Sequence, residues 1–288
     1  MVSKEIFLEN IVEMLELAAT SLPQDVENAL EKAREREENT IAQAQLDAIL
    51  ENVEVAREEK IPMCQDTGLP IFFIKKGTKT TLNFDLKKTL ENAVKKATEK
   101  IPLRPNVVDP LSRKNSNDNT GEKHPLIHTE LVKEDKLEVD IMLKGGGSEN
   151  WSKLFMLNPT TTKQEITEKI TNHVKKAGGQ VCPPTILGIG IGGTATEANT
   201  LAKKTLLKPL NKENTQLTNL KNKIKKKTNN TKIGPMGLGG KTTVLDVKIE
   251  KAGCHTASLP IALNFHCWAA RRAKGEFSNG KFDLKVPK

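Results

Sequence analysis

Three cysteines lie in short segments that could supply metal ligands or reactive thiols. Cys64 opens the segment 64–68 (Cys-Gln-Asp-Thr-Gly), Cys182 precedes two prolines, and Cys267 stands between a histidine and a tryptophan. Their wide separation excludes the close ligand spacing of zinc fingers and bacterial ferredoxins. Taken singly, each could also fill a core, because free cysteine is among the most buried residue types. Spacing alone therefore leaves metal ligation, a reduced thiol and an inert core residue open.

Two loops present polar groups that could contact a ligand. The segment 101–110 contains three prolines, which exclude a helix interior, so we expect an ordered loop that presents Arg104. A guanidinium fork matches a carboxylate, and the alternative is an ordinary surface arginine. The segment 144–150 contains three consecutive glycines, at which backbone amides can approach a ligand closely.

Two glycine-rich motifs resemble nucleotide sites but fail in detail. The segment 188–193 fits G-x-G-x-x-G, yet the second strand with its acidic residue is replaced by a polar tract beginning at Lys208. The segment 239–242 ends like a phosphate-binding loop, but Pro235 occupies the position of the first glycine. We therefore favour a tight strand-to-helix turn and a glycine-rich turn over a nicotinamide or nucleotide site.

The overall composition is that of an ordinary globular protein. The chain has 288 residues, of which 36% are hydrophobic and 28% charged, enough for one large domain or two lobes. The four cysteines include no close pair, which argues against a disulfide framework. With no long apolar run and an acidic, amphipathic start, we expect a cytoplasmic protein without membrane contact. The net charge of +9 accompanies only 3% aromatic residues and no tyrosine, so it indicates a solvated surface rather than a nucleic-acid partner.

Hydrophobic periodicity predicts helices that alternate with short strands. A helical N-terminal lead-in is expected over 1–60, with breaks near Pro23 and Asn39. The segment 211–231 is nearly all Asn, Lys, Thr and Glu, which predicts an exposed helix or a mobile polar stretch. The pattern as a whole predicts an α/β fold, a mixed sheet flanked by helices, in a single domain over 1–288 or in two lobes. Beyond the lead-in we expect strands at 70–74, 137–143, 185–191 and 244–249 and helices at 85–100, 163–176 and 194–207.

Six segments taken together are similar to one known family. In chain order, the segments resemble those of the class I fumarase family, and the likeness runs from about residue 8 to about residue 274. More closely, the chain resembles the α subunit of the two-subunit form, which is related to the α subunit of L-tartrate dehydratase. The segments are 64–68, 144–150, 181–184, 188–193, 234–240 and 267–272.

The resemblance implies an oxygen-sensitive [4Fe-4S] hydro-lyase that interconverts malate and fumarate. It implies that Cys64, Cys182 and Cys267 bind the cluster and leave one iron without a protein ligand, which suits a Lewis acid in water elimination. Cys254 could in principle replace Cys267 as the third ligand, but the Trp-Ala-Ala-Arg-Arg sequence after Cys267 favours the latter. It also implies a β subunit as partner, in a heterotetramer or dimer.

The same resemblance assigns substrate and catalytic positions. It places Gln65, Asp66, Arg104 and the backbone of Gly146 at substrate-contacting positions, and it makes Asp66 and His255 catalytic candidates. Asp66 could orient the substrate hydroxyl or transfer a proton, whereas its structural alternative is capping of the turn at 67–68. The family's remaining substrate arginine, lysine and catalytic base belong to the β half, so we expect little activity from this chain alone.

Three other functions compete with a malate–fumarate hydro-lyase. An L-tartrate dehydratase α subunit is the nearest alternative, although the segment 144–148 is more typical of fumarases. A basic RNA-binding or assembly protein is the non-enzyme alternative, because of the net positive charge. A nicotinamide-dependent dehydrogenase is the remaining one and depends on the glycine motif at 188–193 alone.

Overall fold

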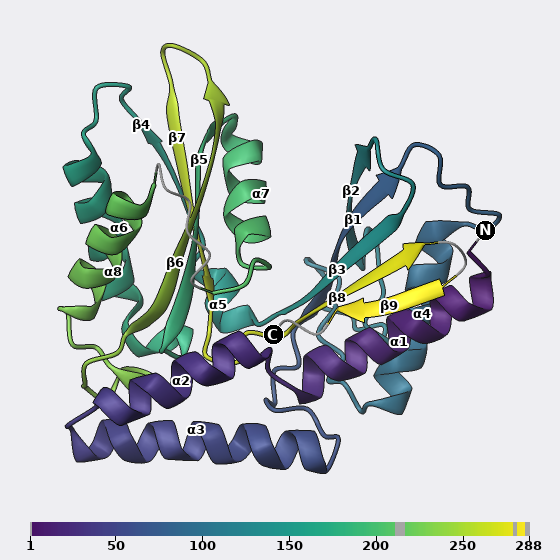
Figure 1. Cartoon of the computed structure of the whole chain (residues 1–288), viewed down its shortest axis with the longest axis horizontal. Coiled ribbons are helices and arrows are strands. Elements are labelled where there is room, and N and C mark those ends of the chain that lie inside the picture. Colours follow the sequence, from purple (N-terminus) through teal and green to yellow (C-terminus); the bar gives the residue numbers. More distant parts are fainter. Residues whose placement is uncertain (1, 211–216, 279–280, 286–288) are drawn as a thin grey trace. The chain divides into compact units, whose positions relative to one another are not determined.

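The computed structural model describes residues 2–210, 217–278 and 281–285 (Figure 1). The chain forms two compact units, each with its own mixed sheet, so the predicted α/β class is confirmed with two sheets in place of one. The first unit comprises residues 1–24, 52–146 and 271–288, and the second comprises 25–51 and 147–270. The lead-in is α1 (Lys4–Thr20), α2 (Gln24–Arg36) and α3 (Thr40–Glu58), and the unit boundary falls within α3.

The first unit is a five-stranded sheet with two helices on one face (Figure 1). Its strand order is β2-β1-β3-β8-β9, in which β1 and β2 are parallel and the other neighbours antiparallel. The helices are α1 and α4 (Leu86–Lys100). The strands are β1 (Leu69–Gly77), β2 (Leu126–Val132), β3 (Leu137–Lys144), β8 (Arg272–Ser278) and β9 (Lys281–Lys285).

Capping and amphipathic spacing explain the two helices of the first unit. The side chains of Ser3 and Asp85 accept backbone hydrogen bonds at the starts of α1 and α4. The apolar face of each helix then packs on the sheet, with Phe7 and Leu90 fully buried against strand residues such as Ile141. Helix α4 also supplies the long crossover that a parallel β1–β2 pair requires.

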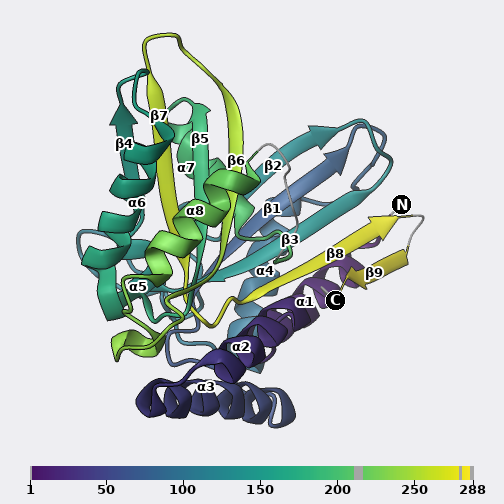
Figure 2. The ribbon, with the colours of Figure 1, turned by 60° about the vertical axis from the view of Figure 1, so that its left-hand side comes forward.

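The second unit is a four-stranded sheet covered on both faces. Helices α6 and α8 lie on one face and α7 on the other, as Figure 1 shows and Figure 2 gives from a second direction. The strand order is β4-β7-β5-β6, and only β5 and β6 are parallel. The strands are β4 (Lys153–Leu157), β5 (Thr185–Gly193), β6 (Val244–Cys254) and β7 (Leu259–His266). The helices are α5 (Gly146–Asn150), α6 (Lys163–Ala177), α7 (Ala195–Thr205) and α8 (Thr218–Asn229), with the short 3-10 turns η1 (Gly178–Val181) and η2 (Pro235–Gly237).

Close packing of α7 explains the glycine motif in β5. Side chains alternate along a strand, so Gly188 and Gly190 share one face, while Leu187 and Ile189 join the core beneath α6 and α8. A Cβ at Gly188 would lie 2.1 Å from the carbonyl oxygen of Ala202 in α7, and one at Gly190 would lie 2.1 Å from that of Ala198. Gly188 and Gly190 therefore allow the helix to lie close to the strand. This is a structural role, which the sequence favoured over a nicotinamide site.

Replacing Gly190 by alanine should destabilise the second unit strongly. The added methyl group would overlap a backbone carbonyl of α7, so the helix must move and its contacts with the sheet must loosen. We expect a loss of about 3 kcal/mol in the free energy of unfolding, measured by urea denaturation. Gly253→Ala is the matched control, because a Cβ added there would have no neighbour within 4 Å, and it should cost less than about 0.5 kcal/mol. Equal effects of the two substitutions would contradict this explanation.

The backbone of the second glycine-rich segment, 239–242, binds a carboxylate of the same chain. The backbone N–H of Lys241 donates to Oε2 of Glu37 at 2.6 Å, and a Cβ at Gly240 would lie 2.8 Å from the same oxygen. Glu37, which is 4% exposed, also accepts from the backbone N–H groups of Glu38 and Asn39. The glycines therefore admit an internal carboxylate, consistent with a turn rather than a phosphate-binding loop.

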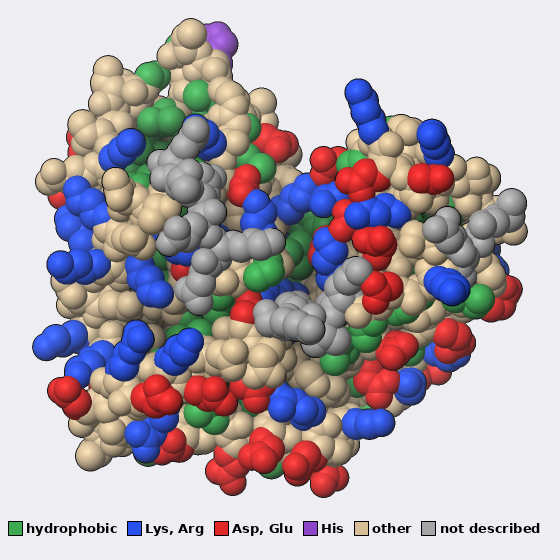
Figure 3. Space-filling view, viewed as in Figure 1, with side chains coloured by type: hydrophobic (Ala, Val, Ile, Leu, Met, Phe, Trp, Pro, Cys, Tyr) green, Lys and Arg blue, Asp and Glu red, His purple; other side chains and the backbone are tan. Residues whose placement is uncertain are grey.

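The lysine-rich segment forms a helix with one buried face. Leu220, Ile224 and Thr228 of α8 are buried, whereas the part of the predicted polar stretch at 211–216 lies outside the described residues. Lysine side chains gather over α6 and α8 (Figure 3), and the Nζ atom of Lys227 lies 3.5 Å from a carboxylate oxygen of Glu168. Among the described helices, none is long and apolar enough for a membrane crossing.

Candidate functional site

Strand pairing in the first unit collects the predicted substrate residues at one end of its sheet. Leu69 at the start of β1 pairs with Lys144 at the end of β3, and Met142 pairs with Arg272 at the start of β8. The segment 64–68 precedes β1, and the glycines follow β3. Antiparallel register therefore brings two segments that are far apart in the sequence to the same edge. A Cβ at Gly68, whose φ is +88°, would lie 2.6 Å from the carbonyl carbon of Leu143, so this approach requires glycine.

Asp66 accepts hydrogen bonds from several segments that meet at this edge of the sheet. Its Oδ2 atom accepts a hydrogen bond from the backbone N–H of Gly146 at 2.7 Å, and its Oδ1 atom accepts from that of Gly68 at 3.0 Å. The side-chain amide of Asn106 donates to Oδ1 at 3.2 Å. Both carboxyl oxygens thus accept from N–H donors on three different loops, and the half-buried side chain has a defined orientation. The bond to Gly68 is the turn cap considered from the sequence, so Asp66 also has a structural role.

The loop that carries Arg104 is tied to the same place. The hydroxyl of Thr67, which is buried beside Asp66, donates to the backbone carbonyl of Arg104 at 3.3 Å. The Arg104 residue is itself exposed, as is Gln65. The structure therefore brings Gln65, Asp66, Arg104 and Gly146 into one part of the first unit.

A buried arginine next to Asp66 was not predicted as a site residue. Arg271 is 1% exposed, and one terminal nitrogen of its guanidinium donates to the backbone carbonyl of Asp66. Its Nε atom has no hydrogen-bond partner among the described residues. A buried cation is costly without a compensating negative charge, so this environment favours an anion nearby. The sequence showed only an Arg-Arg pair after Cys267, which does not distinguish this arginine from a surface one.

Cys182 and Cys267 meet in the second unit. Cys182 follows η1 with a left-handed backbone (φ +50°), and its carbonyl accepts a hydrogen bond from the N–H of Trp268 at 3.2 Å. Cys267 follows β7 directly, and its Sγ atom lies 3.6 Å from the carbonyl oxygen of Ala269. The two half-buried cysteines therefore stand at the same end of the four-stranded sheet, at the start of β5 and the end of β7.

Cys254 and His255 lie at the opposite end of that sheet. Cys254 is the last residue of β6 and His255 begins the β6–β7 turn, and both are exposed. The eight residues of β7 separate this turn from Cys267, which corresponds to about 27 Å at 3.4 Å per residue. The Nδ1 atom of His255 accepts a hydrogen bond from the backbone N–H of Ala257 at 3.1 Å, so Nε2 carries the proton of the neutral ring. Within the second unit, the structure pairs Cys182 with Cys267 and not with Cys254 or His255.

Comparison with known proteins identifies the family. The family model described as fumarate hydratase (Fumerase) matches residues 8–276. The chain belongs to this family. The match includes every residue named above as a predicted site residue, and it extends through both units.

Relatives of this fumarate hydratase family member carry two names. A protein of Methanocaldococcus jannaschii, provisionally named L(+)-tartrate dehydratase subunit alpha, is 46% identical over 270 residues, covering 91% of this chain and 94% of the relative. A provisionally named class I fumarate hydratase of Geobacillus stearothermophilus is 36% identical over 92% of this chain, which spans only 53% of that relative. The L(+)-tartrate dehydratase subunit alpha of Escherichia coli K12 is 28% identical, covering 92% of this chain and 88% of the relative. Both names denote hydro-lyases, so the comparisons support a hydro-lyase.

The chain of this family member offers thiols suited to an iron–sulfur cluster. The four cysteines form no disulfide, and Cys64, Cys182 and Cys267 are half-buried while Cys254 is exposed. Cys64 belongs to the first unit and the other two to the second, and no group of three His, Cys, Asp or Glu side chains in the described residues could hold a metal ion by itself. The partnerless Nε atom of buried Arg271 fits an anionic group such as a thiolate-bound cluster.

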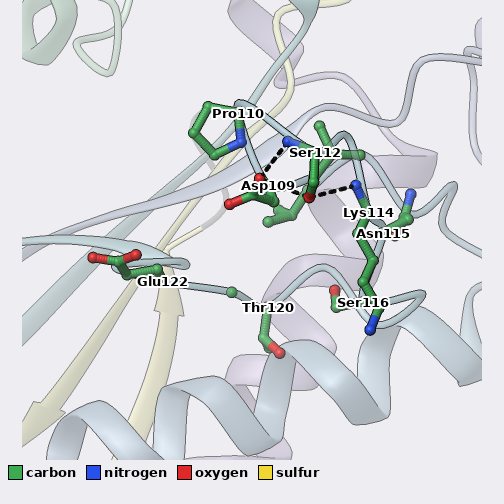
Figure 4. Close-up of a pocket in the computed structure, with 11 residues that line it drawn as sticks. Asp109, Pro110, Ser112, Lys114, Asn115, Ser116, Thr120 and Glu122 are labelled. Carbon is green, nitrogen blue, oxygen red and sulfur yellow. Dashed lines mark hydrogen bonds between the residues drawn. The ribbon is translucent and has the colours of Figure 1, made fainter.

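The fumarate hydratase family member also has a cavity in the first unit. It has a volume of about 440 Å³ and is lined by the loop from Val107 to Glu122 (Figure 4). The carboxylate of Asp109 at its wall accepts a hydrogen bond from the backbone N–H of Ser112 at 2.6 Å, which closes a local turn. The lining contains none of the predicted site residues.

Asp118 stabilises the same loop against α4. Its carboxylate accepts from the backbone N–H and the hydroxyl of Thr120 at 2.9 and 2.7 Å, and it lies 3.2 Å from Nζ of Lys95. Burial alone would raise the pKa of Asp118, but these hydrogen bonds, another from Ser116 and the lysine outweigh it and lower the pKa from 3.8 to about 2.

Asp118→Asn should therefore remove a pH-dependent part of the stability. Because the folded pKa is depressed, the stabilisation is complete above about pH 5 and is lost as the pH falls through about 2. We expect Asp118→Asn to cost about 1–2 kcal/mol at pH 7 and almost nothing at about pH 2, measured by urea unfolding across that range. Asp135→Asn, at an exposed position between β2 and β3 in the same unit, is the control for general charge removal. A cost of Asp118→Asn that did not change with pH would contradict the assignment.

Proposed function

We propose that this chain is the α subunit of a [4Fe-4S] hydro-lyase that interconverts (S)-malate and fumarate plus water. The observation that carries the proposal is the arrangement at Asp66, where segments after Cys64 and after β3 meet the buried guanidinium of Arg271. A β subunit is proposed as partner, in a heterotetramer or dimer, because relatives of similar length are named as alpha subunits.

Cys64, Cys182 and Cys267 are the proposed cluster ligands. Their half-buried thiols and the pairing of Cys182 with Cys267 support this set, and the position of Cys254 at the far end of β7 argues against its taking the third place. Family members of the class I type depend on iron–sulfur clusters. When bound, a cluster with one iron free of protein ligands supplies a Lewis acid for the departing hydroxyl group.

The side chains around Asp66 have distinct proposed tasks. Exposed Arg104 would bind one carboxylate of the substrate through its guanidinium fork, and Gln65 would donate to the same molecule. The amide of Gly146 already donates to Asp66, so a substrate that contacts Gly146 also meets this carboxylate. Asp66 would orient the substrate hydroxyl or transfer a proton, with its direction set by its three donors.

His255 is proposed as a hydrogen-bonding or proton-shuttling residue. The residue is exposed, and Nε2–H is the ring's donor because Nδ1 accepts from Ala257. Since the turn lies at the far end of β7 from Cys267, His255 would act on a substrate site completed by another chain. The remaining substrate-binding groups and the catalytic base would come from the β subunit.

An L-tartrate dehydratase α subunit is the second candidate. The relative at 46% identity carries that name, and it matches this chain in length better than the fumarate hydratase relative does. In tartrate a second hydroxyl group replaces one hydrogen of the CH2 group of malate, so the two substrates differ in the hydrogen-bond donors and acceptors that the site must satisfy.

A single assay can separate these candidates. The chain would be produced with its β subunit, reconstituted without oxygen, and supplied separately with (S)-malate, fumarate and L-tartrate, while the loss or gain of fumarate absorbance and the formation of oxaloacetate are recorded. Turnover of malate and fumarate would support the main proposal, and turnover of tartrate alone would support the second. A complex that contains its cluster and converts none of the three would contradict both.

A further inference from the structure

A buried asparagine lies behind the loop that carries Arg104. Asn119 is 1% exposed and adopts a left-handed backbone, with φ of +59°, which asparagine tolerates better than most residues. Its Oδ1 atom accepts a hydrogen bond from the backbone N–H of Asn106 at 2.7 Å. Its Nδ2 atom donates to the backbone carbonyl of Arg104 at 3.1 Å and to the hydroxyl of Thr98 at 3.1 Å. One side chain therefore holds two backbone groups of the Arg104 loop.

The far side of Asn119 is anchored in a rigid element. Thr98 is 6% exposed in the last turns of α4, and its hydroxyl donates to the carbonyl of Val94 at 2.8 Å while it accepts from Asn119. The helix itself packs into the core of the first unit. The Arg104 loop is thus held against α4 through a buried hydrogen bond. Water competes for such a bond less readily than for an exposed one.

A second asparagine continues the chain of contacts to Asp66. The backbone N–H of Asn106 is held by Asn119, and the side-chain Nδ2 of Asn106 donates to Oδ1 of Asp66 at 3.2 Å. The same Nδ2 lies 3.3 Å from the carbonyl oxygen of Gly68, which fixes the plane of the amide. Two asparagines in series therefore connect α4 with the proposed catalytic carboxylate.

We propose that Asn119 and Asn106 are positioning residues of the hydro-lyase site, Asn119 for Arg104 and Asn106 for Asp66. The inference rests on the proposed function, because it assumes that Arg104 binds the substrate carboxylate and that Asp66 acts on the reacting carbons or hydroxyl. Neither asparagine needs to touch the substrate. Each acts through the residue that it holds, so the two should affect different kinetic constants.

Substitutions of Asn119 and of Asn106 should change different kinetic constants, KM in the first case and kcat in the second. Without the Asn119 amide, the carbonyl of Arg104 keeps only the longer hydrogen bond from the Thr67 hydroxyl. The loop is then held less firmly, and the guanidinium samples positions that do not bind the substrate, which raises KM. Without the Asn106 amide, Asp66 keeps the two backbone donors but loses the side-chain donor that fixes Oδ1, which lowers kcat. A hydrogen bond of this kind corresponds to about a tenfold change in rate or affinity.

The experiment compares three variants of the reconstituted complex with β subunit and cluster. Asn119→Gly removes the amide and keeps a residue that accepts positive φ, and Asn106→Ala removes the donor to Asp66. Asn117→Gly is the matched control, because Asn117 also has a positive φ (66°) on the same loop but is exposed, and its backbone N–H donates to Oδ1 of Asn115 rather than to Arg104 or Asp66. Iron content is measured for each, and kcat is expressed per intact cluster, so that a poorly folded fraction does not lower it.

We expect Asn119→Gly to raise KM about tenfold or more, and Asn106→Ala to lower kcat about tenfold with KM nearly unchanged. Asn117→Gly should match the wild type in both constants. Wild-type constants in the first two variants, or an equal loss in all three, would overturn the positioning role while leaving the proposed function intact. A wild-type complex that holds its cluster and has no hydro-lyase activity would overturn the proposed function and this inference together.

Discussion

Replacement of Cys64, Cys182 or Cys267 by serine is expected to abolish stable iron incorporation, whereas Cys254→Ser should retain about four irons per chain. A serine hydroxyl is a poor substitute for a thiolate as an iron ligand, so loss of one of three protein ligands should leave the cluster open to release. Cys254 is exposed at the far end of β7, so its removal changes no proposed ligand. The measurement is iron and sulfide content with an absorption spectrum after anaerobic reconstitution.

The four serine variants also test whether both units supply cluster ligands, as proposed. Cys182 and Cys267 are joined within the second unit by the Trp268 hydrogen bond, and Cys64 belongs to the first. If Cys64→Ser kept its full iron content while the other two lost it, Cys64 would not be a ligand and the proposed set would be wrong. An unchanged circular dichroism spectrum of each variant would show that iron loss does not follow from unfolding.

Asp66→Asn is expected to lower kcat of the complex by about 10² to 10⁴-fold. The substitution removes a carboxylate at the proposed reaction centre and replaces one acceptor oxygen by an NH₂ group. Because both oxygens of Asp66 accept from N–H donors, the amide must turn its NH₂ toward Gly146 or toward Gly68 and Asn106, and one acceptor is lost. A smaller loss of stability, about 1–2 kcal/mol, should accompany the kinetic effect.

Steady-state kinetics with (S)-malate and urea unfolding measure the two effects separately. Asp109→Asn is the matched control in the same unit, since this exposed aspartate caps a turn through Ser112 and lies outside the group around Asp66. It should alter kcat by less than about twofold. An Asp66→Asn complex that lost stability but retained its turnover per cluster would reduce Asp66 to the turn-capping role.

The local sequence pattern was sufficient to predict helices with one buried face and strands that are continuous apolar runs. Helices α1, α4 and α6 begin at a serine, an aspartate and a threonine cap and follow apolar spacing of three and four residues, which is visible in the sequence. Strands β1 and β5 are apolar runs and were predicted within three residues at each end. Strands β2, β4, β7, β8 and β9 were missed. Edge or charged strands such as Leu126–Val132 lack a buried alternating face. Strand β7 is buried and central but contains Pro260, and proline argues against a central strand.

The residue types of the site were predicted from the sequence, but their grouping was not derivable from it. Cys64, Asp66 and Arg104 stand in unusual local contexts, and their roles came from the resemblance of six segments to one family. The family match supports a hydro-lyase, and the roles stay predictions. Asn106, Asn119 and Arg271 gave no signal, because an asparagine in a polar loop and an arginine beside another arginine are common in any surface. Their importance depends on burial and on the partner atoms, which are properties of the fold.

The sequence by itself determined the longer helices, the strands β1, β3, β5 and β6, the glycine-containing turns and the family. Only the tertiary structure decided that β1 and β3 place Asp66 beside Gly146, that β7 separates Cys267 from Cys254, and that Gly188 and Gly190 admit α7. The physical reason is that caps, turns and periodicity act between residues a few positions apart. Strand register and the burial of single polar side chains result from contacts between residues that are distant in the chain.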